Sequence, residues 1–152
     1  MSKFKVYAIS ILIPVVVGGI VGLIISGSMD YGMLQKPPFA PPSILFPIVW
    51  TILYILMGVS YGILKDNSLI DSEINSIYYA QLAVNALWPI FFFVLKWRLF
   101  AFIWILLLVV LVFLMIRKFY DKNKASGLLQ IPYFLWCLFA TYLNFGIYLL
   151  NK

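Results

Sequence analysis

Between Leu99 and Ile116 the sequence reads LFAFIWILLLVVLVFLMI, a run without a single charged residue. A helix rises ~1.5 Å per residue, so a run of this length crosses most of the ~30 Å hydrocarbon core of a bilayer. Backbone amides find no water in lipid, and a helix satisfies them within the segment itself. The run therefore predicts a transmembrane α-helix, with basic residues at Lys96, Arg98 and Arg117 on its flanks.

Four further runs have the same character, and none of the five contains Asp, Glu, Lys or Arg. The predicted spans are Val6–Ile25, Ile44–Leu64, Ile77–Leu95, Leu99–Ile116 and Leu128–Leu150. The first follows two lysines like a signal peptide, but its length favours an uncleaved span. We predict an all-α integral membrane protein, a five-transmembrane-helix bundle that forms a single membrane domain over residues 1–152, with a long first loop at residues 26–43.

The composition excludes several other classes of protein. Of the 152 residues 64% are apolar and 11% are charged, against ~45–50% and ~25% in soluble domains. A small soluble domain cannot bury so much apolar surface. A soluble enzyme, a nucleic-acid-binding module and a disordered chain are therefore excluded. The net charge of +6 comes from residues between the apolar runs, where membrane topology places them, so we predict no nucleic-acid partner.

The distribution of Lys and Arg predicts the orientation in the membrane. The N-terminus and the second and fourth loops hold 7 of these residues, and the other ends hold 4. Cytoplasmic loops carry the excess of basic residues. We therefore predict a multi-pass protein with its N-terminus in the cytoplasm and its C-terminus outside.

Several chemistries have no residues to support them. There is no histidine, and Cys137 is the only cysteine, so zinc sites of the usual kind and histidine-ligated haem are excluded. Ion-coupled carriers and proton pumps usually keep ionisable groups within the membrane, and these spans have none. We predict no metal site and no required cofactor, and a ligand bound by aromatic surface and neutral hydrogen-bonding groups.

Neutral polar and aromatic residues share a face in three of the spans, at spacings close to whole helical turns. They are Trp50, Tyr54 and Tyr61 in the second span, Gln81, Asn85, Trp88 and Phe92 in the third, and Pro132, Trp136, Ala140 and Asn144 in the fifth. We expect these faces to line a cavity between the second, third and fifth spans that opens toward the first loop.

Each of these residues also has a purely structural interpretation. Asn85 can hold neighbouring helices together, as polar residues in lipid often do. Trp97 and Trp104 are typical of interfacial anchors or packing residues. Gly18 and Gly22 predict a close approach of a neighbouring helix. The fourth span has no polar side chain and indicates a lipid-facing or scaffold helix.

Four blocks of the sequence resemble a known family. They read YGMLQKPPFAPP over Tyr31–Pro42, FPIVWTILYILMG over Phe46–Gly58, QLAVNALWPIFF over Gln81–Phe92 and PYFLWCLFATYLN over Pro132–Asn144. The blocks are similar to the first loop and the second, third and fifth helices of the tryptophan-rich sensory protein/translocator protein family (TspO/MBR), which includes the peripheral-type benzodiazepine receptor.

The resemblance implies a five-helix bundle, often a homodimer, with a hydrophobic pocket beneath the first loop. Family members bind porphyrins such as protoporphyrin IX and haem, and synthetic ligands of the benzodiazepine-receptor type; some bind cholesterol, and some bacterial members are reported to degrade protoporphyrin in light. The implied ligand contacts, with Tyr54 added from its helical face, are Tyr31, Trp50, Tyr54, Asn85, Trp88, Trp136, Ala140, Leu143 and Asn144. The family often has tryptophan where Phe39 and Ile44 stand here, which affects the lid over the pocket.

The resemblance implies two candidate functions. The first is a membrane receptor or translocator that binds porphyrin or another hydrophobic small molecule, with Lys36 as the nearest cation for the propionates. The alternative is light-dependent oxidative degradation of protoporphyrin IX, with Trp50 and Trp136 as catalytic redox partners.

Further partners follow from the same sequence. The lipid bilayer surrounds the spans. The small pair Ser76 and Ala80 in the third helix is compatible with a parallel homodimer through that helix and equally with close packing inside one bundle, and we predict the homodimer. A sterol-type pattern, Leu143…Tyr148…Lys152, makes sterol a further candidate ligand.

Overall fold

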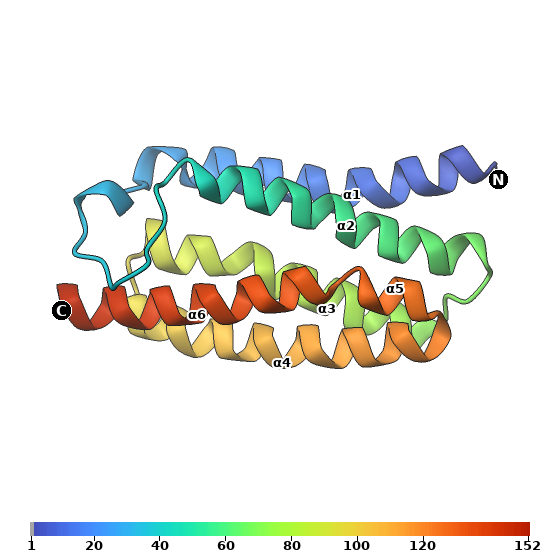
Figure 1. Cartoon of the computed structure of the whole chain (residues 1–152). Helices are drawn as coiled ribbons and strands as arrows, with labels where there is room; N and C mark the ends of the chain where they lie inside the picture. The colour runs from blue at the N-terminus through green and yellow to red at the C-terminus, as the bar shows by residue number, and fades with distance from the viewer. Residues whose placement is uncertain (1) are drawn as a thin grey trace.

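The computed structural model describes residues 2–152, and their regular structure is entirely helical (Figure 1). The helices are α1 Lys3–Ile25, α2 Leu45–Asp66, α3 Ser72–Pro89, α4 Arg98–Lys122, α5 Lys124–Leu128 and α6 Ile131–Asn151. The short segments are the 3-10 turns η1 Ser26–Ser28 and η2 Tyr31–Met33 and the π-helical segment η3 Ile90–Val94. Among these residues 5 helical stretches are long and apolar enough to cross a membrane. The predicted all-α, five-span architecture is confirmed.

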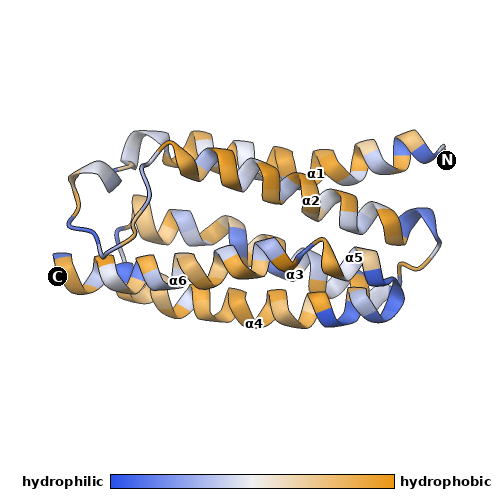
Figure 2. Cartoon of the chain, viewed as in Figure 1, coloured by the Kyte–Doolittle hydropathy of each residue, from blue (hydrophilic) through white to orange (hydrophobic). Residues whose placement is uncertain are grey.

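The polar residues gather at the two ends of the bundle. Figure 2 shows mostly apolar residues over the middle of the long helices and hydrophilic residues in the turns at both ends. The N-terminus lies at one end, and the C-terminus lies at the other beside the loop that joins α1 to α2 (Figure 1). This banding is what a bilayer requires, because apolar side chains then meet the hydrocarbon and turns meet water.

Two connections are shorter than hydropathy predicts. The second loop, predicted over residues 65–76, ends at Asp71, whose side chain caps α3 by accepting a hydrogen bond from the Ile74 N–H at 2.8 Å. The fourth loop, predicted over residues 117–127, is almost entirely helical, since α4 continues to Lys122 and Asn123 caps α5. Hydropathy marks where a chain leaves the hydrocarbon, whereas capping decides where the helix ends.

The third span changes its winding near its end. Pro89 has no N–H to continue the α-helical ladder, and η3 follows with a wider turn in which the Leu95 N–H bonds to the Ile90 carbonyl at 2.9 Å. Phe92 and Phe93, two large rings of this segment, are both buried in the bundle.

Glycines set the distance between α1 and α2, which pack chiefly on each other. A Cβ added at Gly58 would lie 2.4 Å from the Ile11 Cα. Gly18 makes the close approach predicted for it, since a Cβ there would lie 2.3 Å from a Tyr54 ring carbon. Gly22 does not, because nothing lies within 4 Å of the corresponding position.

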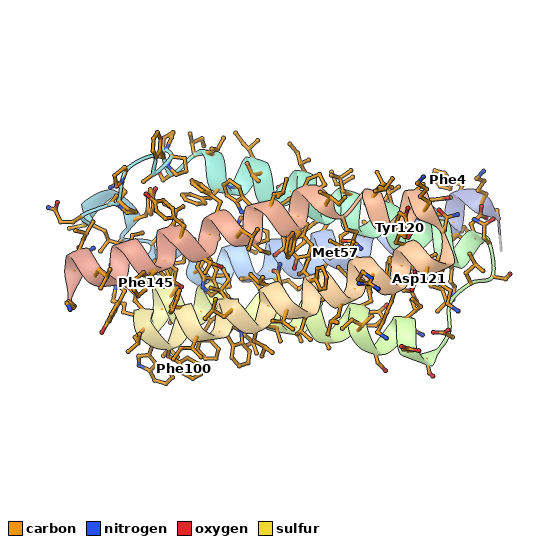
Figure 3. All side chains as sticks on the ribbon, turned by 60° about the horizontal axis from the view of Figure 1, so that its bottom comes forward. Phe4, Met57, Phe100, Tyr120, Asp121 and Phe145 are labelled. Carbon is orange, nitrogen blue, oxygen red and sulfur yellow. The ribbon has the colours of Figure 1, made fainter. Side chains whose placement is uncertain are left out.

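The α4 helix is a scaffold on one face and lipid-facing on the other. Its buried residues recur at helical spacing and pack against α3 and α6. They are Ala101, Ile105, Leu108, Val112, Met115 and Phe119. The opposite face exposes large apolar residues, including Phe100, which points away from the bundle in Figure 3.

Met57 lies near the middle of the bundle (Figure 3) and divides it into two halves. We call the part between Met57 and the N-terminal end the packed half. Its centre is filled by aromatic rings: Tyr61 and Tyr78 lie 4.6 Å apart between ring centroids, and Tyr78 and Phe119 lie 5.9 Å apart. We call the part between Met57 and the α1–α2 loop the hollow half.

Candidate ligand-binding cavity

The hollow half contains a cavity of about 660 Å³. Its walls come from α1, α2, α3 with η3, and α6, and residues of the α1–α2 loop lie over it. Among the described residues that line it, none is charged. The cavity is thus an apolar space with a few neutral polar groups.

All nine residues predicted for the site lie around this one cavity. They come from the loop, α2, α3 and α6, and they are Tyr31, Trp50, Tyr54, Asn85, Trp88, Trp136, Ala140, Leu143 and Asn144. Their convergence is a fact of the fold; that they bind a ligand stays a prediction.

The sequence analysis missed one wall. We expected the cavity to lie between the second, third and fifth spans, but the first span also lines it through Val15, Gly18, Gly19 and Gly22. The glycines of the first span are the signal in the sequence for this wall, and their interpretation as a packing motif does not reveal it.

Two aromatic groups form parts of the walls. Trp50 stacks on Tyr54 with ring centroids 5.7 Å apart. Trp136 meets the edge of Phe46 at 5.9 Å, and Phe46 in turn contacts Tyr31 at 4.9 Å. Offset and edge-on contacts are the arrangements that aromatic quadrupoles favour, so these rings are held in place before any ligand arrives.

A hydrogen-bonded network forms the floor. The Tyr54 O–H donates to Asn85 Oδ1 at 2.6 Å, and Asn85 Nδ2 donates to the Tyr133 oxygen at 2.7 Å. The Tyr133 O–H then donates to Gln81 Oε1 at 2.7 Å. All four residues are buried. Asn85 therefore joins neighbouring helices, as its structural interpretation predicts. It also lines the cavity.

A second network links the cavity wall to the loop. The Trp88 indole N–H donates to Asn144 Oδ1 at 2.9 Å, and Asn144 Nδ2 donates to the Arg98 carbonyl at 2.8 Å. The Arg98 guanidinium binds both carboxylate oxygens of Asp30 at 2.8 Å, and Lys96 lies 3.5 Å from one of them. Burial raises the pKa of Asp30, but the hydrogen bond and charge of Arg98 and the charge of Lys96 lower the pKa by more.

The α1–α2 loop is fastened to α6 as a lid over the cavity. The Gln35 N–H donates to Asn151 Oδ1 at 3.0 Å, and Asn151 Nδ2 donates back to the Gln35 carbonyl at 2.8 Å. The Tyr142 O–H donates to the Pro38 carbonyl at 2.6 Å. We call these contacts, together with the Asp30–Arg98 pair, the lid latch.

Lys36 has a structural task in the lid. Its ammonium donates to the carbonyls of Tyr31 and Leu34 at 3.0 and 3.1 Å, and it does not line the cavity. These two bonds use two of the three ammonium N–H groups, and a contact of Lys36 with ligand propionates stays a prediction. Tyr31 is itself fixed, since its O–H donates to the Pro41 carbonyl at 2.6 Å.

The indole N–H groups of the cavity differ in their partners. Trp88 is satisfied by Asn144, whereas the buried Nε1 of Trp136 has no hydrogen-bond partner among the described residues. An unsatisfied buried donor costs free energy. The Trp136 side chain thus lines the cavity with its own N–H buried and without an acceptor among the described residues.

Trp97 and Trp104 lie outside the cavity, as predicted for anchor or packing residues. They form an aromatic cluster with Phe91 and Phe100 on the outer surface of α3, η3 and α4. The Trp104 N–H donates to the Val84 carbonyl at 2.8 Å. These two tryptophans are natural controls for the three that line the cavity.

The fold and the cavity define a small multi-pass integral membrane protein with one aromatic cavity beneath a latched loop. Residues 10–150 match the family described as TspO/MBR. This chain belongs to the TspO/MBR family, which confirms the resemblance seen in the sequence.

Individual relatives agree with this assignment. The chain is 43% identical over 122 residues to a protein named "Tryptophan-rich protein TspO" from Archaeoglobus fulgidus, covering 80% of this chain and 79% of that one. It is 34% identical over 155 residues to "Protein CrtK" from Rhodobacter capsulatus, covering 99% and 94%. It is 32% identical over 126 residues to "Translocator protein" from Ovis aries, covering 80% and 75%.

Proposed function

We propose that this protein is a membrane receptor or translocator that binds porphyrins, such as protoporphyrin IX and haem, and other hydrophobic ligands in the cavity. The observation that carries the proposal is the cavity of about 660 Å³ with Trp50, Trp88 and Trp136 in its walls. Its volume falls in the ~300–1,000 Å³ range of small-molecule sites. A flat macrocycle gains from contact with indole faces and from removal of its own apolar faces from water.

The hydrogen bonding of the walls supports recognition by shape rather than by polar contacts. Both polar atoms of the Asn85 side chain and both of Asn144 already have protein partners. The Trp136 N–H has no acceptor among the described residues, but it is buried. A site of this kind accepts several flat apolar molecules, and because the sequence has no histidine, metal-free porphyrin suits it better than haem.

The alternative function is light-dependent oxidative degradation of protoporphyrin IX, with dioxygen as the oxidant. The observation that favours it is the stack of Trp50 on Tyr54, whose O–H donates to Asn85 at 2.6 Å. An indole beside a hydrogen-bonded phenol can give one electron to the photo-excited porphyrin, which passes it to dioxygen to form superoxide. The indole radical cation then recovers an electron from the porphyrin, which is left oxidised by one electron. In this scheme Trp50 and Trp136 are the redox partners.

The test is a titration of protoporphyrin IX into the protein in lipid nanodiscs, in darkness, followed by quenching of tryptophan fluorescence. Trp50→Ala and Trp136→Ala each remove a stacking indole, so we expect binding at least roughly tenfold weaker. Trp97→Phe and Trp104→Phe are matched controls outside the cavity. Equal losses in the controls would place the porphyrin elsewhere.

Illumination then separates the two functions. If the protein is a receptor or translocator, the absorption spectrum of bound protoporphyrin IX should change under light no faster than that of free protoporphyrin IX. An enzyme forms a new absorbing product faster than free porphyrin does. In that case Trp50→Phe and Trp136→Phe should keep most of the affinity and lose turnover, because phenylalanine is harder to oxidise than an indole.

We also propose that the N-terminus is cytoplasmic and that the lid faces outward, on the 7-to-4 distribution of Lys and Arg. Met33, in η2, is exposed in the lid. Met33→Cys in a Cys137→Ala background should react with an impermeant thiol reagent in intact cells. Labelling only after lysis would reverse the orientation.

A further inference from the structure

The cavity is closed on one side and open on the other. Its lining residues from α3 and α6 are largely buried, including Asn85, Ala140, Leu143 and Asn144. Among its lining residues from α1 and the first part of α2, Gly19, Gly22, Pro47 and Thr51 are exposed, whereas Val21 and Ile25 are buried. The same space is therefore walled by α3 and α6 and reaches the surface between α1 and α2.

The separation of α1 and α2 explains this opening. In the packed half the two helices touch, since a Cβ at Gly58 would lie 2.4 Å from Ile11 and a Cβ at Gly62 would lie 2.7 Å from Tyr7. The last such contact is Gly18 against Tyr54. Beyond it the helices diverge.

The two α1 glycines beyond Gly18 that line the cavity have no neighbour across the gap. Nothing lies within 4 Å of a Cβ built at Gly19 or Gly22. Thr51 lies seven residues, about two turns, before Gly58 and so shares its face of α2, yet it is exposed where Gly58 is buried. We call this gap between α1 and α2 the side opening.

The rim of the side opening is apolar. Ile20, Leu23 and Ile24 are exposed on α1, and Ile48 and Ile52 are exposed on α2. Both helices are membrane spans. Large exposed aliphatic side chains at this depth face acyl chains rather than water.

The route from water is obstructed by the lid. The lid latch ties Asp30 to Arg98, Gln35 to Asn151 and Pro38 to Tyr142. Tyr31 lies buried beneath it. A molecule from the aqueous side must break these contacts, whereas one dissolved in the hydrocarbon meets the side opening directly.

We infer that ligands enter and leave the cavity sideways, from the hydrocarbon of the bilayer, through the side opening between α1 and α2. This inference deepens the proposed function, because it restricts the ligands to apolar and amphiphilic molecules that first dissolve in the membrane. The latched lid then serves as a fixed roof during exchange, and the glycines of α1 keep the entrance free of side chains.

The experiment measures access to the cavity with a probe that needs no affinity for it. Ala140 is a buried lining residue, so Ala140→Cys in a Cys137→Ala background places a single thiol in the cavity. The protein is reconstituted in phosphatidylcholine vesicles, and the rate of labelling by N-(1-pyrenyl)maleimide, which partitions into the bilayer, is followed by fluorescence. Failure of porphyrin binding would not affect this rate, so the two proposals fail separately.

Gly22→Trp places a large side chain in the side opening, where space exists for it. We expect labelling about tenfold slower, the effect of a modest added barrier. Thr51→Trp obstructs the opposite rim and serves if Gly22→Trp does not fold. Gly27→Trp is the matched control, since Gly27 also has nothing within 4 Å but does not line the cavity; its rate should be unchanged.

The lid is tested in the same vesicles. Asp30→Asn and Asn151→Ala loosen the lid latch, and the side route predicts the same labelling rate as in the parent. Faster labelling in these variants would show that access is through the lid and would overturn the inference. An unchanged rate in both rim variants would overturn it as well, since the side opening would then hold only lipid.

Discussion

Glycines on α1 and α2 have opposite consequences in the two halves of the bundle. In the packed half Gly58 and Gly62 receive the backbone of Ile11 and the ring of Tyr7, so that two helices come into contact. In the hollow half Gly19 and Gly22 face empty space. The difference teaches that glycine in a membrane helix leaves space on the surface of that helix. Whether this space is occupied depends on the path of the neighbouring helix.

The largest effect that this comparison predicts is on stability. Gly58→Leu puts a side chain against the Ile11 Cα and the Ser10 carbonyl, 2.4 and 2.6 Å from the new Cβ. Backbone cannot rotate away as a side chain can, so we expect a loss of about 3 kcal/mol or more. The measurement is unfolding in detergent followed by circular dichroism.

Gly22→Leu is the matched variant in the hollow half, where nothing lies within 4 Å. Leucine also has a higher helix propensity than glycine, so we expect equal or slightly higher stability. If the two variants were equally destabilising, the packing contrast between the halves would be lost.

A middle-sized effect is predicted at the boundary between the halves. Tyr133→Phe removes the hydroxyl that joins Asn85 to Gln81 and leaves an N–H and an oxygen without that partner. A buried polar group deprived of its partner costs about 1–3 kcal/mol. Unfolding in detergent measures this cost, and Phe134→Leu, away from the network, is the control. If Tyr133→Phe left the free energy of unfolding unchanged, water would have to reach the floor and hydrogen-bond to the groups that lose the Tyr133 hydroxyl.

The smallest effect concerns the lid latch. The pKa of Asp30 lies below its ordinary value of 3.8, because the interactions with Arg98 and Lys96 outweigh the effect of burial. A carboxyl with a lowered pKa stabilises the latched form above its ordinary pKa, and this contribution is lost as pH falls through the lowered value. The latch should therefore be intact at neutral pH and loosen below about pH 3.8.

A spin label on Met33→Cys, in a Cys137→Ala background, would report this loosening as increased mobility. Asp30→Asn should give the mobile spectrum already at neutral pH, with a cost of about 1–2 kcal/mol to the latched form. Asp66→Asn, in the exposed last turn of α2, should change nothing. A lid of equal mobility in all three proteins would show that Gln35, Pro38 and their partners hold it without Asp30.

The sequence predicted the hollow half well because its walls repeat at helical spacing. Trp50 and Tyr54, or Asn85 and Trp88, fall on one face of a span wherever that span packs, so periodicity and the family resemblance place them in the same cavity. Trp97 lies between Lys96 and Arg98, and these charges mark it as an interfacial residue and not as a cavity residue. These inferences need only the geometry of a single helix.

The remaining features depend on partners that periodicity cannot identify. The Gln35–Asn151 contact joins residues 116 positions apart, and the Asp30–Arg98 pair joins a loop to a helix start. The role of Gly22 depends on where α2 diverges from α1. Helix ends at Asp71 and Asn123 depend on single capping bonds that hydropathy does not register.

The floor of Tyr54, Asn85, Tyr133 and Gln81 has an electrical consequence. The cavity ends there, and an ion on its way across the membrane would still face the aromatic core around Tyr78, at the cost of leaving its hydration shell. We therefore expect the protein to be an insulator in spite of its hollow half. On this expectation, many copies in an energised membrane would leak neither protons nor salt, and the membrane potential would remain available to drive other work.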